Sequence, residues 1–250
     1  MPDKTGAFGK SMFRTTIVVA WTILATIFFG INSILASFLD KTGNIAHRVA
    51  RIWAASILRV SGIRVKLRGL KNIDPSASYI YMANHQSNFD IPVLLAHLPV
   101  QFRWLAKAEL FKIPFFGLAM RRVGYISIDR GDFRSAVKSL KKAAETIQKG
   151  TSVVIFPEGT RSLDGKIRDF KKGGFIMAID SKVPIVPVVI HGTRAIMPKA
   201  TLRIWTNNNV LIEVKKPIPT SDYTRKRKDM LMANVRKSIC ESFERKVLGV

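Results

Sequence analysis

The segment from Tyr79 to Asp90 contains a histidine and an aspartate that could carry out acid–base chemistry. His85 and Asp90 stand five residues apart, directly after a short apolar run. A histidine can act as a general base near neutral pH when a carboxylate holds its second ring nitrogen and fixes the tautomer. The residues between the two favour a turn, so the chain can fold back and bring the carboxylate to the ring. Ser87 is a competing nucleophile, but it lacks the glycines of a nucleophile elbow.

This segment is the first of four sequence blocks that together resemble the glycerolipid acyltransferases. The blocks occur in the family's order, between about position 65 and about position 215. They are Asn84 with His85 and Asp90; Lys107–Leu110 with Pro114, Gly117 and Ile128–Arg130; Phe156–Arg161; and Val183–Val188. Their compact spacing is similar to that of the small bacterial-type 1-acylglycerol-3-phosphate acyltransferases within the family.

The resemblance implies that a fatty acyl group moves from a thioester to the free hydroxyl of 1-acylglycerol 3-phosphate, which gives phosphatidate. It implies that His85 removes the proton of that hydroxyl and that Asp90 orients the ring, with no acyl-enzyme intermediate. The donor is expected to be acyl-CoA or acyl carrier protein, which acts as a co-substrate, and no other cofactor is expected. Glycerol 3-phosphate or another lysophospholipid is the alternative acceptor.

The acceptor's phosphate requires cationic and backbone donors, which the third block can supply. Arg161 can bind phosphate oxygens through two N–H groups, and Gly159 allows a close approach of the backbone. Glu158 is an anion, so we expect it to orient Arg161 or a glycerol hydroxyl instead of binding the phosphate. The complete set of candidate substrate-binding residues is Lys107, Arg130, Glu158, Gly159, Thr160 and Arg161.

The composition indicates an anionic partner. The 250 residues carry a formal net charge of +24, and 47% of them are hydrophobic. Such a charge is typical of proteins that bind nucleic acid or an acidic lipid surface. Nucleic-acid binding requires a recognisable module or aromatic residues among the basic ones, and the basic run at Arg225–Lys228 has only Tyr223 nearby. An anionic membrane is therefore favoured over nucleic acid. The single cysteine, Cys240, excludes a disulfide within the chain, and no Cys/His cluster has the spacing of a metal site.

The N-terminal part of the chain is typical of a membrane anchor. Residues Thr15 to Leu39 contain no charge and are numerous enough to cross a bilayer. The following residues, 41–71, include many basic side chains and no acidic one. Between Ile45 and Val60, apolar residues recur at helical spacing, which predicts a basic amphipathic helix. We expect that helix to lie on an anionic membrane, because it directly follows the anchor. The alternative is that it packs its apolar side on the domain.

We therefore expect N-terminal membrane-anchoring helices at 1–62 and an acyltransferase domain at 63–250. The expected location is a membrane, the bacterial inner membrane, with the catalytic domain on its cytoplasmic side. The first helix could either cross this membrane or lie in its interface.

The remainder of the chain alternates strand and helix, which predicts an α/β domain with a mixed, partly parallel sheet flanked by helices. The expected strands are Arg64–Leu70, Tyr79–Met82, Val123–Ile128, Ser152–Phe156 and Ile185–Ile190, with a hairpin of Leu202–Trp205 and Val210–Val214. The expected helices are Asp90–His97, Phe133–Lys149, Lys172–Ser181 and Tyr223–Leu248. Active sites in open sheets lie beyond the carboxyl ends of the strands. Because the first and third blocks each follow an expected strand, both should reach the same edge of the sheet.

Overall fold

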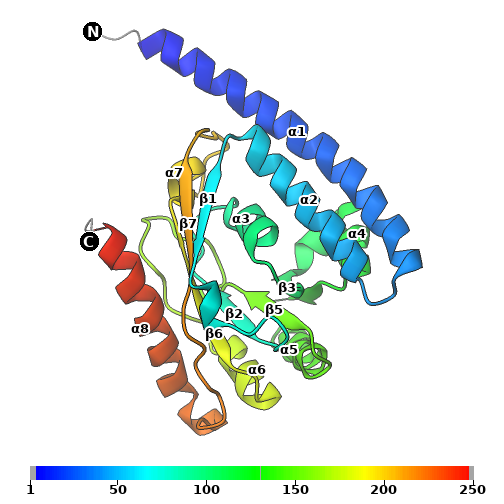
Figure 1. The fold of residues 1–250 in the computed structure, drawn as a ribbon, viewed down its shortest axis with the longest axis vertical. Coiled ribbons are helices and arrows are strands. Elements are labelled where there is room, and N and C mark those ends of the chain that lie inside the picture. Colours follow the sequence, from blue (N-terminus) through cyan, green and yellow to red (C-terminus); the bar gives the residue numbers. More distant parts are fainter. Residues whose placement is uncertain (1–3, 130, 248–250) are drawn as a thin grey trace.

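The central element of the structure is one sheet of seven strands, in the order β1-β7-β6-β2-β5-β3-β4. The computed structural model describes residues 4–129 and 131–247 (Figure 1). The strands are β1 (Arg64–Arg68), β2 (Ile80–Ala83), β3 (Phe102–Lys107), β4 (Ile126–Ile128), β5 (Ser152–Ile155), β6 (Ile185–His191) and β7 (Asn209–Val214). The helices are α1 (Lys4–Leu39), α2 (Asn44–Val60), α3 (Asp90–His97), α4 (Phe116–Val123), α5 (Phe133–Gln148), α6 (Gly173–Ser181), α7 (Thr193–Ile196) and α8 (Lys228–Val247). Short 3-10 turns occur at Leu70–Asn72, Ala108–Lys112 and Arg225–Arg227.

Most strands of the sheet run parallel. β2 pairs in parallel with β5 and β6, and β3 pairs in parallel with β5 and β4. β7 is antiparallel to β6 and parallel to β1, so these two strands at one end of the sheet point the opposite way. Every residue of β2, β5 and β6 is buried, as is typical of parallel strands that are covered on both faces. The carboxyl ends of β2, β3, β4 and β5 consequently lie at one edge.

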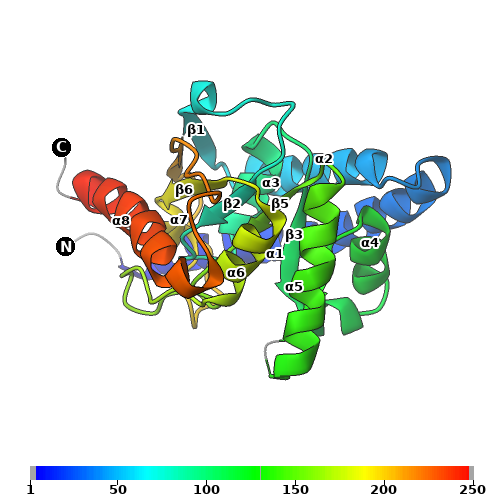
Figure 2. The same cartoon turned by 90° about the horizontal axis from the view of Figure 1, so that it is seen from below.

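Helices cover both faces of the sheet and form two apolar layers. On one face, α1, α2 and α3 pack on the sheet through side chains that include Val18 and Leu94. On the other face, α5, α6 and α8 pack through side chains that include Ile147 and Phe175. Figure 1 shows α1 and α2 on the side away from α8, and Figure 2 shows α5, α6 and α8 in front of the sheet with α1 behind it. The expected fold class is confirmed.

The long helix α1 lies along α2 and α4 with one side and is exposed on the other. Trp21 Nε1 donates to Ser56 Oγ (3.2 Å), and Trp53 Nε1 donates to Thr26 Oγ1 (3.1 Å), so the two N-terminal helices are joined by polar contacts. The exposed side is strongly apolar. It includes Phe13, Ile23, Leu24, Ile27, Phe28, Leu35, Phe38 and Leu39.

The helix α2 divides its apolar residues between the domain and the surface. Ile57 is buried, and the Arg51 guanidinium donates to the Ala96 carbonyl (3.2 Å), which fixes one side of the helix to α3. Ile45 and Ile52 remain exposed. One side of this helix therefore packs on the domain, which is the alternative to the expected position on a membrane. The exposed apolar strip is narrower than expected, and its contact with a membrane stays a prediction.

The structure corrects several expected elements. Leu202–Trp205 is not a strand, so the expected hairpin is wrong, and β7 pairs with β1 and β6 instead. β3 and α4 have no counterpart among the expected elements, and Val123, the expected start of a strand, ends α4. The last helix begins at Lys228 and not at Tyr223, while its expected end, Leu248, lies outside the described residues.

The buried strand β3 is difficult to predict because it contains a charged residue. Arg103 is only 3% exposed. Its guanidinium donates to the carbonyls of Phe102 (3.0 Å) and Thr42 (2.8 Å) and to Asn44 Oδ1 (2.8 Å). These acceptors, which include Thr42 of the turn between α1 and α2 and Asn44 at the start of α2, compensate for the burial of the charge.

Candidate active site

His85 and Asp90 lie together just beyond the carboxyl end of β2, as their spacing predicts. Asp90 Oδ2 lies 2.8 Å from His85 Nδ1. The same oxygen accepts hydrogen bonds from the backbone N–H of Gln86 (2.7 Å) and of Ser87 (2.8 Å). The Asp90 side chain is fully buried, whereas 14% of the His85 side chain is exposed. A carboxylate at Nδ1 leaves Nε2 as the basic nitrogen, so the ring can accept a proton from a ligand.

The turn that carries this pair is fixed to its neighbours. The Asn84 side chain pairs with the backbone of β6, because Oδ1 accepts from the Ile190 N–H (2.7 Å) and Nδ2 donates to the Ile190 carbonyl (2.9 Å). Ser87 Oγ donates to the Met197 carbonyl (2.8 Å) and accepts from the Phe89 N–H (3.2 Å). Ser87 is completely buried. A hydroxyl engaged in this way is not placed to attack a substrate, which argues against Ser87 as a nucleophile.

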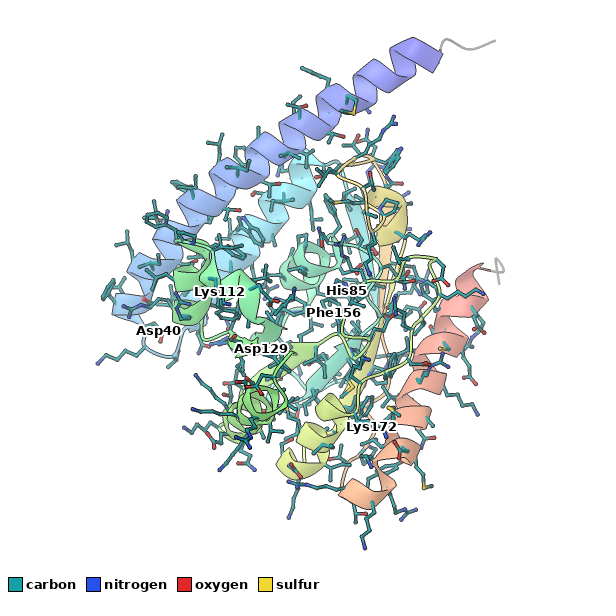
Figure 3. The ribbon with its side chains drawn as sticks, turned by 180° about the vertical axis from the view of Figure 1, so that it is seen from behind. Asp40, His85, Lys112, Asp129, Phe156 and Lys172 are labelled. Atoms are coloured by element: carbon teal, nitrogen blue, oxygen red, sulfur yellow. The ribbon has the colours of Figure 1, made fainter. Side chains whose placement is uncertain are left out.

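The imidazole of His85 is held from one side by an aromatic stack. Figure 3 shows His85 and Phe156 side by side in the middle of the molecule. Their ring centroids are 3.9 Å apart with planes inclined by 8°, and Phe156 stacks in turn on Trp104 at 5.3 Å. Asp90 fixes the edge of the imidazole and Phe156 limits its tilt. The sequence places Phe156 in the third block, but nothing in its local pattern distinguishes it from an ordinary core phenylalanine.

The carboxylate of Glu158 joins the two loops of the site. Oε1 accepts from the His85 N–H (2.7 Å) and Oε2 from the Arg168 N–H (2.8 Å), while the His85 carbonyl accepts from the Ser162 N–H (2.9 Å). Glu158 is only 1% exposed. Burial raises its pKa to about 7, against the opposing effect of the two N–H donors. Both of its oxygens bind backbone N–H groups, and among the described residues no hydrogen bond or ion pair joins it to Arg161. Its expected contact with a glycerol hydroxyl stays a prediction.

The turn from Gly159 to Arg161 presents polar groups beside His85. Gly159 has a φ of +77°, in the left-handed region that favours glycine. Within the described part of the chain, the Arg161 guanidinium has no hydrogen-bond or ion-pair partner. Its planar set of donors is therefore available to an anion, which it can bind through two parallel hydrogen bonds.

Two further expected binding residues differ in what the structure shows of them. Lys107 lines the same cavity as His85 and Arg161. Its ammonium lies 2.9 Å from Glu109, and both side chains are more than half exposed, so this ion pair contributes only about 0–1 kcal/mol and can exchange for a ligand. Arg130 lies outside the described residues. Among the described side chains, no group of three or more His, Cys, Asp or Glu could hold a metal ion.

A cavity of about 550 Å³ extends from His85 between the sheet and the helices α1 to α4. One part of its lining is polar and carries His85, Lys107, Thr160 and Arg161. The rest is mostly apolar and includes Phe29, Trp53, Ile91, Leu95, Ala119 and Met120. The helix α1 thus forms one wall of the cavity, and the arrangement suits a ligand with a polar head and a long apolar tail.

One cation beside this site has no counterpart among the expected residues. Lys199 Nζ donates to Thr160 Oγ1 (3.2 Å) and to the Arg161 carbonyl (3.0 Å). Lys199 follows α7, outside all four sequence blocks. Its local sequence gives no signal of a binding residue, since only the fold brings this segment to the third block.

Known proteins resemble this chain over most of its length. A family model described as Acyltransferase matches residues 64–191. The chloroplastic 1-acyl-sn-glycerol-3-phosphate acyltransferase of Arabidopsis thaliana is 39% identical over 199 residues, which are 79% of this chain and 54% of that protein. The 1-acyl-sn-glycerol-3-phosphate acyltransferase alpha of Homo sapiens is 33% identical over 197 residues, which are 78% of this chain and 69% of that protein. This chain therefore spans about half the length of the plant relative.

A solved structure shares the fold. The crystal structure of the 1-acyl-sn-glycerophosphate acyltransferase PlsC from Thermotoga maritima matches with a TM-score of 0.80 at 27% identity, and the match covers 94% of this chain and 95% of that chain. Because so little of this chain is left uncovered, the likeness includes the N-terminal helices as well as the sheet.

Proposed function

This chain belongs to the acyltransferase family, and on that basis we propose that it transfers a fatty acyl group from a thioester to the free hydroxyl of 1-acylglycerol 3-phosphate, giving phosphatidate. The observation that carries this proposal is the buried Asp90 carboxylate on Nδ1 of His85, at the polar part of an otherwise apolar cavity. A base in that position supports direct transfer between the donor and the acceptor.

In the proposed reaction, His85 Nε2 takes the proton of the acceptor hydroxyl as its oxygen attacks the thioester carbonyl carbon. The new C–O bond forms, the C–S bond breaks, and the leaving thiolate recovers the proton from the imidazolium. The anionic Asp90 stabilises the imidazolium between these steps. A positioned base of this kind typically contributes about 10²–10⁴-fold to the rate. Coenzyme A or acyl carrier protein serves as the acyl carrier, and the reaction as proposed uses no other cofactor.

The polar and apolar residues of the cavity lining suggest how the substrates are placed. The fatty acyl chain occupies the apolar part, where each buried methylene contributes about 0.8 kcal/mol. The acceptor's phosphate lies at the turn of Gly159 to Arg161, where the free guanidinium supports an assignment to phosphate binding. Lys107 lines the same polar region and is proposed as a second cation.

The N-terminal helix supports a membrane location. Residues Met12 to Leu39 of α1 are long and apolar enough to cross a bilayer. We propose that α1 instead lies in the interface of one leaflet, because its other side packs on the domain at Val18 and Ala25 and as far as Ala36. A helix of this kind binds a membrane by inserting its exposed apolar face among the lipids and by electrostatic attraction to anionic lipids. The bacterial inner membrane, with the domain on the cytoplasmic side, is the proposed location.

An acceptor panel tests the proposed function. Purified enzyme in vesicles is assayed with lysophosphatidate, glycerol 3-phosphate and other lysophospholipids, each with acyl-CoA and with acyl-loaded carrier protein. We expect lysophosphatidate to be the best acceptor, and His85→Ala to lower kcat at least 100-fold, in line with the loss of a general base. His97→Ala, which removes a histidine that does not line the cavity, is the control and should keep most activity. Turnover of His85→Ala above about a tenth of wild type would exclude the base role.

A further inference from the structure

Lys199 is the cation with the most specific contacts to the proposed acceptor site. Its ammonium donates to the Thr160 hydroxyl (3.2 Å) and to the Arg161 carbonyl (3.0 Å). An ammonium has three N–H donors. Two of them therefore hold the turn of the third block, and the third has no partner among the described residues.

The backbone on both sides of Lys199 is fixed relative to His85. Before it, the Met197 carbonyl accepts from Ser87 Oγ (2.8 Å), which belongs to the His85 turn. Ala200, directly after Lys199, has a φ of +69°, a conformation that costs energy for a residue with a side chain. The Met197 contact brings this segment to the His85 turn, and the two hydrogen bonds of the Lys199 ammonium place its side chain at Thr160 and Arg161.

The charges around this turn are unbalanced. Lys199 and Arg161 belong to one hydrogen-bonded unit, and neither has a carboxylate partner in the described part of the chain. Arg161 belongs to this turn and Lys199 is bonded to its backbone, so an anion at the turn would be attracted by both charges. Thr160, whose hydroxyl accepts from Lys199, can donate its own hydrogen to that anion. These three donor types match the oxygens of a phosphate monoester.

We propose that Lys199 binds the phosphate of the acceptor together with Arg161, while it holds the Gly159–Arg161 turn in place. This assignment rests on the proposed function. The same chemistry would fit a phosphate of the acyl carrier, so the experiment has to separate the two sources.

The test compares Lys199→Met, Lys199→Arg and the control Lys166→Met, which removes an exposed lysine from the loop that carries Thr160 and Arg161. The acceptor and donor KM and kcat are measured with lysophosphatidate and a saturating co-substrate, and Tm is recorded. We expect Lys199→Met to raise the acceptor KM roughly 10-fold to 100-fold, as for loss of a charged hydrogen bond. The donor KM should stay within about twofold, and Lys199→Arg should recover part of the acceptor affinity, because it keeps the charge but replaces the ammonium by a planar guanidinium. Lys166→Met should leave all constants near wild type.

Combination with Arg161→Ala tests whether both cations act on one phosphate. The double variant should raise the acceptor KM by less than the product of the two single effects, since groups that share a partner are not additive. A raised donor KM with an unchanged acceptor KM would place Lys199 at the carrier's phosphates and overturn the proposal. A lower kcat and Tm with both KM values unchanged would show that Lys199 only stabilises the turn. This result would also overturn the proposal.

Failure of the proposed function gives a different result. In that case the wild-type enzyme itself would not use lysophosphatidate with either donor. The same variants, assayed with whichever acceptor is active, would still decide whether Lys199 binds a phosphate group.

Discussion

The carboxylate of Glu158 accepts a hydrogen bond from the backbone N–H of His85 at 2.7 Å. Its other oxygen accepts from the Arg168 N–H at 2.8 Å. One buried side chain therefore sets the position of the proposed base relative to the loop that follows the proposed phosphate-binding turn. The glutamate of the third block therefore holds the backbone of the site in place.

Replacement of Glu158 by glutamine should lower kcat by roughly 10-fold or more with smaller changes in both KM values. Glutamine offers one acceptor oxygen, so one of the two N–H groups would face an amide nitrogen. An unsatisfied buried donor costs about 1–3 kcal/mol, and relaxation of the loop would shift His85. Steady-state kinetics check this, with the exposed carboxylate variant Asp169→Asn as control. An acceptor KM that rises while kcat stays constant would indicate that Glu158 binds the acceptor directly.

The raised pKa of Glu158 predicts a pH dependence of stability. The pKa rises from 4.5 to about 7 on folding, so between these values the folded protein binds more protons than the unfolded chain. The contribution of this group to the free energy of unfolding therefore falls as pH rises from about 4.5 to about 7, by at most about 1.4 kcal/mol per pH unit, and is constant above that. Urea unfolding in mild detergent at pH 5, 6, 7 and 8 should show a shallower decline for Glu158→Gln. Equal slopes for wild type and variant would contradict the assignment.

Ala119→Phe should shift the acyl preference towards shorter chains. Ala119 lines the cavity from α4, and its Cβ lies 3.9 Å from the position that a Cβ on Gly30 of α1 would occupy. A phenyl ring would therefore fill space between the two helices. The values of kcat/KM are compared for thioesters of increasing chain length. Leu118→Phe, at the exposed neighbouring position on α4, is the matched control and should not change the preference. Similar shifts in both variants would mean that the chain does not enter this part of the cavity.

Charges on the outer face of α1 should release the protein from membranes. Leu24 and Phe28 are more than half exposed on that face, and burial of a glutamate in the membrane interface is costly. Leu24→Glu combined with Phe28→Glu should strongly reduce sedimentation with vesicles that contain anionic lipids. Val137→Glu on α5, which covers the opposite face of the sheet, should bind as wild type does. Equal loss in both proteins would show that the change reflects net charge and not a specific face.

The parts of the fold that the sequence predicts are those with uniform local patterns. The strands β2, β5 and β6 are continuous apolar runs, and α3 occupies the expected residues Asp90 to His97. β3 escapes prediction because Arg103 interrupts its apolar run, and the charge is compensated by groups from the distant turn before α2. The prediction of a hairpin at Leu202 is wrong for a similar reason, because β7 pairs with β1 and β6 and not with the segment next to it in the sequence.

In the candidate site, too, local contacts are predictable from the sequence and contacts between remote segments are not. The contact between His85 and Asp90 depends on a short turn, so the spacing of the two residues predicts it. The partners of Glu158 and the approach of Lys199 depend on loops that meet only in the folded chain. A local sequence pattern does not show which loops meet in the folded chain, and for this reason it does not predict the backbone contacts of Glu158.

The helix α1 has an apolar outer face and an inner face that lines the cavity, so the proposed membrane attachment and the proposed substrate site share one structural element. Any agent that lifts α1 from the domain would remove a wall of the cavity and expose its interior to water. Detergent extraction should therefore impair the enzyme even where His85 and Asp90 are undisturbed. In the cell, this dependence of the cavity on α1 would restrict turnover to the membrane, where lysolipid is supplied and product is absorbed. A molecule that is not bound to the membrane would be inactive.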